Sequence, residues 1–238
     1  MKSSTETINN QYSLSIRFAS DGFSLFIFDE NQKLLSSKKT PSDLLSLTED
    51  KLFDLLANEK ELNLNFHSVQ VVFETDFYSI VPKVLFEPEN AKDLLAFQHP
   101  EIKSTDTILY NELLAWNAIL VFTIPKAINS AIRKFLPEVD AEHHIIDFIN
   151  NEIALQNDSS THIYVRNNKM DIVVLKTGKL TLINTYEFNT KEDFLYHVMN
   201  VYEQLSLDSE KCSSYIYNNR PELTEIVGKY IRNCKAAN

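Results

Sequence analysis

Residues 14–29 read LSIRFASDGFSLFIFD, and this stretch decides the fold because the chain repeats its plan later. An alternating apolar strand leads into Asp21-Gly22, a pair that predicts a hairpin because type I′ turns need positive φ at both central positions. Residues 163–175, IYVRNNKMDIVVL, have the same order of strand, turn at Asn167-Asn168, and strand. The two copies align at an offset of about 147 positions, so we expect a duplicated unit.

Each copy continues into a third strand and a helix. The third strands are expected at 33–37 and 180–186, and the helices begin after Thr48 and Thr190, whose hydroxyls suit the N-cap position. Further strand and helix patterns follow each copy, and a last amphipathic helix is expected from Pro221 onward. The order predicts an α/β fold with two related β-β-β-α lobes.

The polar stretch 156–160 marks the expected boundary between these lobes. We expect a first lobe over 1–156, with residues 1–11 disordered, and a second, smaller lobe over 157–238. The first residues form no apolar signal segment, and the apolar run at 113–125 is too short to span a bilayer. Two cysteines without a CxxC pattern suit a reducing compartment. We therefore expect a cytoplasmic protein that does not insert into a membrane.

Charge and glycine content exclude several classes of function. The net charge is −10 with a pI near 5.1, and no run of basic residues occurs, which disfavours a nucleic-acid partner. The chain has only three glycines, so it lacks material for glycine-rich phosphate loops. The remaining expectation is a protein partner of unknown identity, with the oligomeric state left open.

The chain resembles the actin-like ATPase superfamily, which includes sugar kinases, the ATPase domain of heat-shock chaperones and the cytoplasmic actin-like proteins of type IV pilus and type II secretion machines. It also resembles an uncharacterised bacterial family with that fold. The residues that carry the resemblance are 14–29, IVPKVLF at 80–86 and NTYEFNTKEDFLYHVMNVYEQLSLD at 184–208. The resemblance implies an actin-like ATPase (ribonuclease H-like) fold whose two lobes face a cleft. It brings no established activity.

In active members of that superfamily, the first hairpin turn of each half holds a DxG-type phosphate loop. Asp21 and Gly22 occupy the matching turn here, but they are adjacent, and Asn167 and Asn168 in the second half include neither Asp nor Gly. These four residues are the candidates for a cofactor site. Asp21-Gly22 is interpreted as a plain hairpin turn, with a residual anion site as the alternative.

Several other polar residues are of types that can act in catalysis or bind a metal ion. Glu74 and Asp76 follow a predicted buried strand, where α/β enzymes place catalytic acids and where solvated loops also carry carboxylates. His143-His144 lies near Asp147, but neighbours on a strand point to opposite faces, which disfavours a shared metal ion. Cys212 follows Lys211, which could lower the pKa of the thiol. We assign no catalytic and no metal-binding residue.

These observations favour a non-catalytic, actin-like scaffold or adaptor that acts through protein–protein contacts, without a cofactor. The alternative is an ATP-binding or ATP-hydrolysing protein with atypical phosphate loops, which would use ATP and Mg²⁺. A third possibility is a small-molecule sensor that performs no chemistry.

Overall fold

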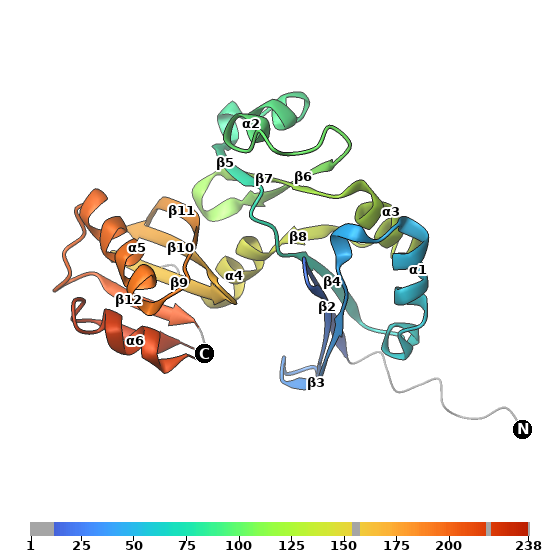
Figure 1. Ribbon diagram of the computed structural model, residues 1–238, viewed down its shortest axis with the longest axis horizontal. Coiled ribbons are helices and arrows are strands. Elements are labelled where there is room, and N and C mark those ends of the chain that lie inside the picture. The colour runs from blue at the N-terminus through green and yellow to red at the C-terminus, as the bar shows by residue number, and fades with distance from the viewer. Residues whose placement is uncertain (1–11, 154–157, 218–219, 238) are drawn as a thin grey trace, which may run out of the picture. The chain divides into compact units, whose positions relative to one another are not determined.

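The structure is a computed structural model that describes residues 12–153, 158–217 and 220–237 (Figure 1). Two compact units are distinguished, Met1–Asp147 and Phe148–Asn238. The expected boundary at 156 and the expected disorder of residues 1–11 lie outside the described residues. The limits of the lobes therefore stay a prediction, and each unit is described by itself.

The first unit is built on a five-stranded sheet of order β3-β2-β1-β4-β8. The first three strands form an antiparallel meander, and β4 and β8 run parallel to β1. The alternate apolar residues Leu14, Ile16 and Phe18 of β1 are buried. Helices α1 and α3 pack against each other through Phe53 and Phe135. The strands are β1 (Ser13–Ala19), β2 (Gly22–Phe28), β3 (Leu34–Pro41), β4 (Ser68–Phe73) and β8 (Ala141–His143), and the helices are α1 (Glu49–Ala57) and α3 (Lys126–Phe135).

A three-stranded antiparallel sheet lies between β4 and β8 in the sequence. It consists of β5 (Tyr78–Pro82), β7 (Ala118–Ile124) and β6 (Thr107–Leu113), in that spatial order. Helix α2 (Ala91–Gln98) packs on one face through Ala91. Strand β5 accommodates Pro82 because the proline is its last residue on an outer strand, where a missing backbone N–H is tolerated.

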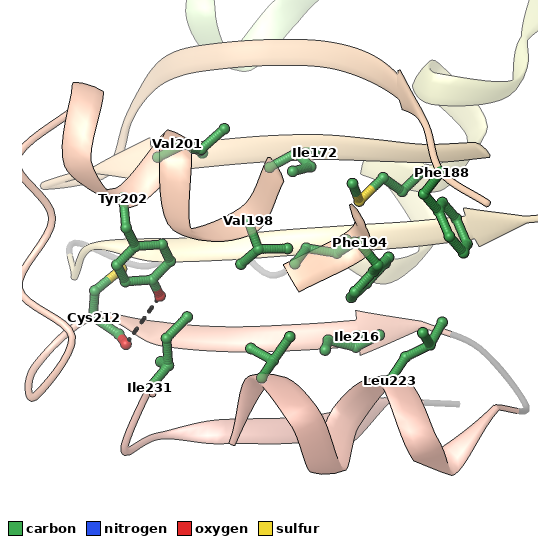
Figure 2. Packing of buried hydrophobic residues seen from close by; sticks show 14 residues of the cluster. Ile172, Phe188, Phe194, Val198, Val201, Tyr202, Cys212, Ile216, Leu223 and Ile231 are labelled. Carbon is green, nitrogen blue, oxygen red and sulfur yellow. Dashed lines mark hydrogen bonds between the residues drawn. The ribbon is translucent and has the colours of Figure 1, made fainter. Parts of the chain in front are cut away.

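The second unit repeats this strand order in the sheet β11-β10-β9-β12-β13. Again the first three strands are antiparallel and the last two run parallel to the first. Helices α5 and α6 cover one face, and Phe194 and Val198 of α5 meet Ile172 and Ile216 of the sheet (Figure 2). The elements are β9 (Ser160–Arg166), β10 (Lys169–Lys176), β11 (Lys179–Glu187), β12 (Ser213–Tyr217), β13 (Cys234–Ala237), α5 (Lys191–Gln204) and α6 (Pro221–Val227).

The division between the units falls within helix α4 (His144–Glu152). The matching strand orders confirm the predicted α/β fold with two sheet-and-helix lobes. Duplication of an ancestral unit stays a prediction. None of the helices in the described ranges is long and apolar enough to cross a membrane.

Helix α5 begins where the sequence placed it. The Thr190 hydroxyl accepts the amide of Asp193 at 3.0 Å, and the Asp193 carboxylate accepts the amide of Thr190 at 3.1 Å, which completes a capping box. Hydrogen bonds from the amides of Asn189 and Thr190 lower the pKa of Asp193. The carboxylate thus stabilises the helix end at neutral pH.

The C-terminal region departs from the expected long helix. Helix α6 ends at Val227, and β13 then adds a parallel strand beside β12. Ile231 lies in the segment between α6 and β13 and is fully buried in the second core. The periodicity of apolar residues predicted a helix there. Periodicity is a local signal and contains no information on the pairing of β13 with β12.

The first hairpin also differs in detail from the expected type I′ turn. Its two central residues are Ser20 and Asp21, neither of which has positive φ, and Gly22 opens β2 with φ 137°. A Cβ on Gly22 would lie 2.3 Å from the Thr40 carbonyl oxygen and 2.9 Å from the Ser42 nitrogen. Glycine is required because the backbone at the end of β3 passes against it.

We expect Gly22→Ala to lower the free energy of unfolding by about 2–5 kcal/mol, because the new methyl group clashes with backbone and the φ is unfavourable for alanine. The matched control is Gly228→Ala, at a helical φ of −62° with its nearest Cβ contact at 3.1 Å. The control should change stability by no more than about 1 kcal/mol. Urea unfolding of the two variants measures the difference, and equal losses would contradict this role of Gly22.

Candidate functional site

The first candidate turn is held by contacts to the end of β3. The Asp21 carboxylate pairs with Lys39 at 2.7 Å, and the Asp21 carbonyl accepts the amide of Ser42 at 3.1 Å. The space beside Gly22 is occupied by the Thr40 carbonyl. Both residues thus serve the packing of the meander.

The second candidate turn is held in a comparable way within its own unit. Asn167 has φ 47°, a left-handed conformation that asparagine tolerates. Its carbonyl accepts from the Arg220 guanidinium at 3.3 Å, and the Asn168 carbonyl accepts the amide of Phe188 at 2.8 Å. The Arg220 side chain also pairs with Glu222 at 3.0 Å. The two turns belong to different units, and each makes its own internal contacts.

A cluster of charged side chains surrounds Arg17, which by strand alternation lies on the other face of β1 from the buried Ile16 and Phe18. Arg17 of β1 forms an ion pair with Asp147 of α4, and its guanidinium lies 3.8 Å from Glu74, which follows β4. The Gln70 amide donates to Glu142 at 2.6 Å and to Asp147 at 3.0 Å. Sequence reasoning singled out Glu74 as a possible acid but missed its neighbour Arg17. The available signal was an arginine as the one charged residue of β1.

The arrangement gives these carboxylates a resident counter-ion. Asp147 is nearly fully buried, and an ionised buried carboxylate is stable only when it is paired and hydrogen-bonded. Arg17 and Gln70 supply those contacts. The Glu74 carboxylate therefore lies beside an arginine, and Asp76 lies two residues further, where its carbonyl accepts the amide of Tyr78 at 3.1 Å.

The two neighbouring histidines are fully buried in the first unit. Strand β8 ends at His143 and α4 begins at His144, so their rings lie side by side with centroids 4.3 Å apart, and the expected opposite orientation was wrong. His143 Nδ1 accepts the amide of Ile145, which leaves Nε2–H to donate to the Thr75 carbonyl at 3.0 Å. Within the described ranges, no three His, Cys, Asp or Glu side chains are grouped to hold a metal ion.

The thiol of Cys212, considered above for a lowered pKa, has a raised pKa instead. Cys212 is buried beside Tyr202 in the second core, and burial raises the pKa of its thiol (Figure 2). The neighbouring Lys211 pairs with Asp208 at 3.2 Å. The expected lowering of the thiol pKa by Lys211 was wrong because desolvation is the larger effect.

The second unit contains a buried polar chain that sequence reasoning missed. Tyr217 donates to the Glu152 carbonyl at 3.1 Å, so His162 Nδ1–H donates to the Tyr217 hydroxyl at 3.1 Å. His162 Nε2 then accepts from Ser160 at 3.0 Å. Burial lowers the pKa of His162 to about 4, so the imidazole is neutral and a weak base at pH 7. Its fixed contacts indicate a structural role.

We expect Arg17→Met to lower the free energy of unfolding by about 2–3 kcal/mol, because the variant leaves Asp147 buried without its counter-ion. Adding Asp147→Asn should recover much of that loss. Lys39→Met is the matched control, since it breaks the exposed pair with Asp21 and should cost less than about 1 kcal/mol. Chemical denaturation measures all three variants, and failure of the second substitution to restore stability would contradict the pairing.

We expect His162 to make stability fall in acid. Its pKa is about 4 in the folded chain and 6.5 in an ordinary histidine, so the unfolded chain binds the proton first as the pH falls. Stability from this group is complete above pH 6.5 and declines toward pH 4, by about 3 kcal/mol in total. Between pH 7.5 and pH 4.5, the melting temperature should therefore fall less for His162→Gln than for the wild type. In the control His67→Gln, which changes an exposed histidine, the melting temperature should fall with pH as much as in the wild type.

Comparison with known structures confirms the actin-like fold. A Bacteroides thetaiotaomicron VPI-5482 protein with an actin-like ATPase fold and unknown function matches with TM-score 0.82 at 24% identity, over 98% of this chain and 93% of that chain. The PilM-PilN type IV pilus biogenesis complex matches with TM-score 0.61 at 11% identity, over 95% and 88% of the chains. The ethanolamine utilization protein EutJ from Carboxydothermus hydrogenoformans matches with TM-score 0.51 at 9% identity, over 98% and 88%.

These identities establish a shared fold and do not by themselves transfer an activity. No curated protein matches the chain. A family model matches residues 2–234, which is nearly the whole sequence. The chain belongs to the family described as "Protein of unknown function (DUF3822)".

Proposed function

We propose that this chain is a non-catalytic, actin-like scaffold or adaptor that acts in the cytoplasm through protein–protein contacts. Such a protein has the two-lobed actin-like fold and lacks the nucleotide chemistry of active superfamily members. No cofactor is required for it, and the partner is a protein.

The observation that carries the proposal is the internal use of the first candidate turn. Gly22 has its open side against the Thr40 carbonyl, and the Asp21 carboxylate is paired with Lys39. A carbonyl oxygen repels phosphate, and a lysine-paired aspartate is a poor ligand for Mg²⁺. These contacts favour a structural role for the turn over a phosphate site.

A second observation favours a surface function. Three aliphatic side chains at one end of the three-stranded sheet are strongly exposed, and we call them the apolar tip: Val84 at 83%, Leu85 at 70% and Leu114 at 81%. They lie in the short helices η3 (Lys83–Leu85) and η5 (Leu114–Trp116). The Lys83 amide donates to the Asn117 carbonyl at 2.9 Å, which holds the two segments together. Grouped exposed apolar side chains often mark interaction sites.

The structural neighbours are compatible with this function. One matching structure is a complex of PilM with PilN, so a protein of this fold takes part in a protein–protein assembly. This supports the class of function by analogy alone and says nothing about the identity of the partner here.

We expect millimolar Mg-ATP to leave the melting temperature unchanged. A ligand at about 100 times its dissociation constant would stabilise the fold by roughly 2.7 kcal/mol, or about 5–10 °C for a chain of this size. A rise with Mg-ATP but not with AMP or Mg²⁺ alone would contradict the proposal and favour the ATP-binding alternative.

The partner is tested on the same preparation. A stoichiometric partner that co-purifies with the wild type should be lost from Val84→Asp and Leu114→Asp. It should be retained by Leu45→Asp, which changes an equally apolar side chain that is 64% exposed outside the tip. Retention by all three variants would exclude the apolar tip as the contact surface.

A further inference from the structure

The three-stranded sheet and the segments that join its strands carry the most exposed large hydrophobic side chains. They occupy residues 78–124 of the 238-residue chain. Phe97, which is 91% exposed, and the three residues of the apolar tip have the four highest exposures among large hydrophobic residues in the described ranges. Exposed apolar surface is thus concentrated in one part of the first unit, as at an interaction site.

The apolar tip continues onto a pair of aromatic rings. Phe86 directly follows Leu85 in the chain, and its ring centroid lies 4.9 Å from that of Tyr110 on β6. Phe86 packs against the small core beneath α2, whereas the Tyr110 ring is half exposed. The apolar surface therefore has a fixed side along the outer strand β6.

Negative charge predominates beside this surface. The segments 82–90 and 110–117, which contain the tip and the aromatic pair, include three glutamates and one lysine. The lysine, Lys83, is paired with Glu112 at 2.7 Å. The charge of the other two glutamates is left over, so these segments have a net negative charge.

Those two glutamates are held close to the tip. Glu87 and Glu89 are exposed in the short loop between Phe86 and Ala91, and both ends of the loop pack in the same small core. The Glu87 carboxylate accepts one hydrogen bond, from the neutral side-chain amide of Asn90 at 2.9 Å. That bond does not neutralise its charge.

We propose that the apolar tip binds a basic amphipathic segment of another protein. Apolar side chains of the segment cover Val84, Leu85 and Leu114, and its lysine or arginine side chains lie beside Glu87 and Glu89. Complementary charge at the rim of an apolar contact selects the partner and fixes its register. The inference rests on the proposed function, because it gives the chemistry of the partner that the tip contacts.

The charge beside the tip argues against other occupants of an apolar surface. Anionic lipid headgroups and nucleic-acid phosphates repel Glu87 and Glu89. A second copy of this chain, joined tip to tip about a twofold axis, brings the same glutamates toward each other. A basic segment is the occupant that gains from them.

A pair of model peptides tests the chemistry of the partner. The probe is a helical peptide with leucine on one face and lysine on the other, and the comparison peptide has glutamate in place of each lysine. Fluorescence anisotropy should show that the wild type binds the lysine peptide at least about tenfold more tightly. Added salt should weaken this binding, because exposed charges are screened. Equal affinity for the two peptides would overturn the inference.

Charge reversal shows whether the lysine peptide binds at the tip. Glu87→Lys combined with Glu89→Lys should weaken its binding about tenfold, because two favourable contacts become repulsive. The matched control combines Glu203→Lys with Glu225→Lys, which makes the same change in net charge at exposed positions of the second unit. The control should weaken binding by less than about threefold.

Removal of one apolar side chain tests the other half of the contact. Leu114→Ser should weaken binding of the lysine peptide at least about tenfold, because a leucine side chain no longer becomes buried. Phe97→Ser is the control at the other end of the sheet, since the adjacent Gln98 accepts from Ser79 near the start of β5 and the tip follows its end. This control should change the affinity by less than about twofold. Circular dichroism and melting curves identify any variant that fails to fold.

The outcomes separate this inference from the proposed function. A partner that is lost from Leu114→Asp but withstands the combined Glu87→Lys and Glu89→Lys change would leave the adaptor function standing and overturn the basic segment. Stabilisation by Mg-ATP would contradict the adaptor function without altering the peptide result. Binding of the wild type to anionic lipid vesicles, or a wild-type dimer in sedimentation equilibrium, would overturn the inference if Leu114→Ser abolished it.

Discussion

The ion pair between Arg17 and Asp147 is the contact on which the arrangement of the first unit depends most. It joins the central strand β1 to helix α4, and Gln70 of β4 donates to the same carboxylate. Asp147 is nearly fully buried, so the pair contributes to stability, because an unpaired carboxylate in that position is strongly destabilising. Glu74, which the sequence offered as a possible acid, lies 3.8 Å from the same arginine.

Other buried polar groups of the chain are likewise hydrogen-bonded by neighbours in their own unit. Asp171 is fully buried, where Arg166 donates to it through two nitrogens and Thr185 donates to one of its oxygens. His162 is held neutral between Ser160 and Tyr217. In each case the hydrogen-bonding capacity of the group is directed to a neighbour in the same unit. Such networks specify the packing of a unit and leave little capacity for an external ligand.

Sequence reasoning could predict the elements whose signals are local. The capping pair Thr190 and Asp193 predicts the start of α5, and alternating apolar residues predict β1 and β9. It could not place β13, which depends on pairing with β12, nor the partner of Arg17, which lies 130 positions away in the chain. The hairpin at Gly22 was anticipated for the wrong reason, because the close approach of Thr40 is a tertiary contact that no dipeptide signal contains.

The two sheets share one strand order but differ at their edges and turns. If shape alone were retained, both outer strands should be equally protected, because an open edge carries a risk of aggregation. Lysines and a proline protect β3, whereas the centre of β11 is uncharged and adjoins the exposed ring of Tyr196. Within one shared strand order, the two edges thus differ in the property that decides whether another strand can pair with them.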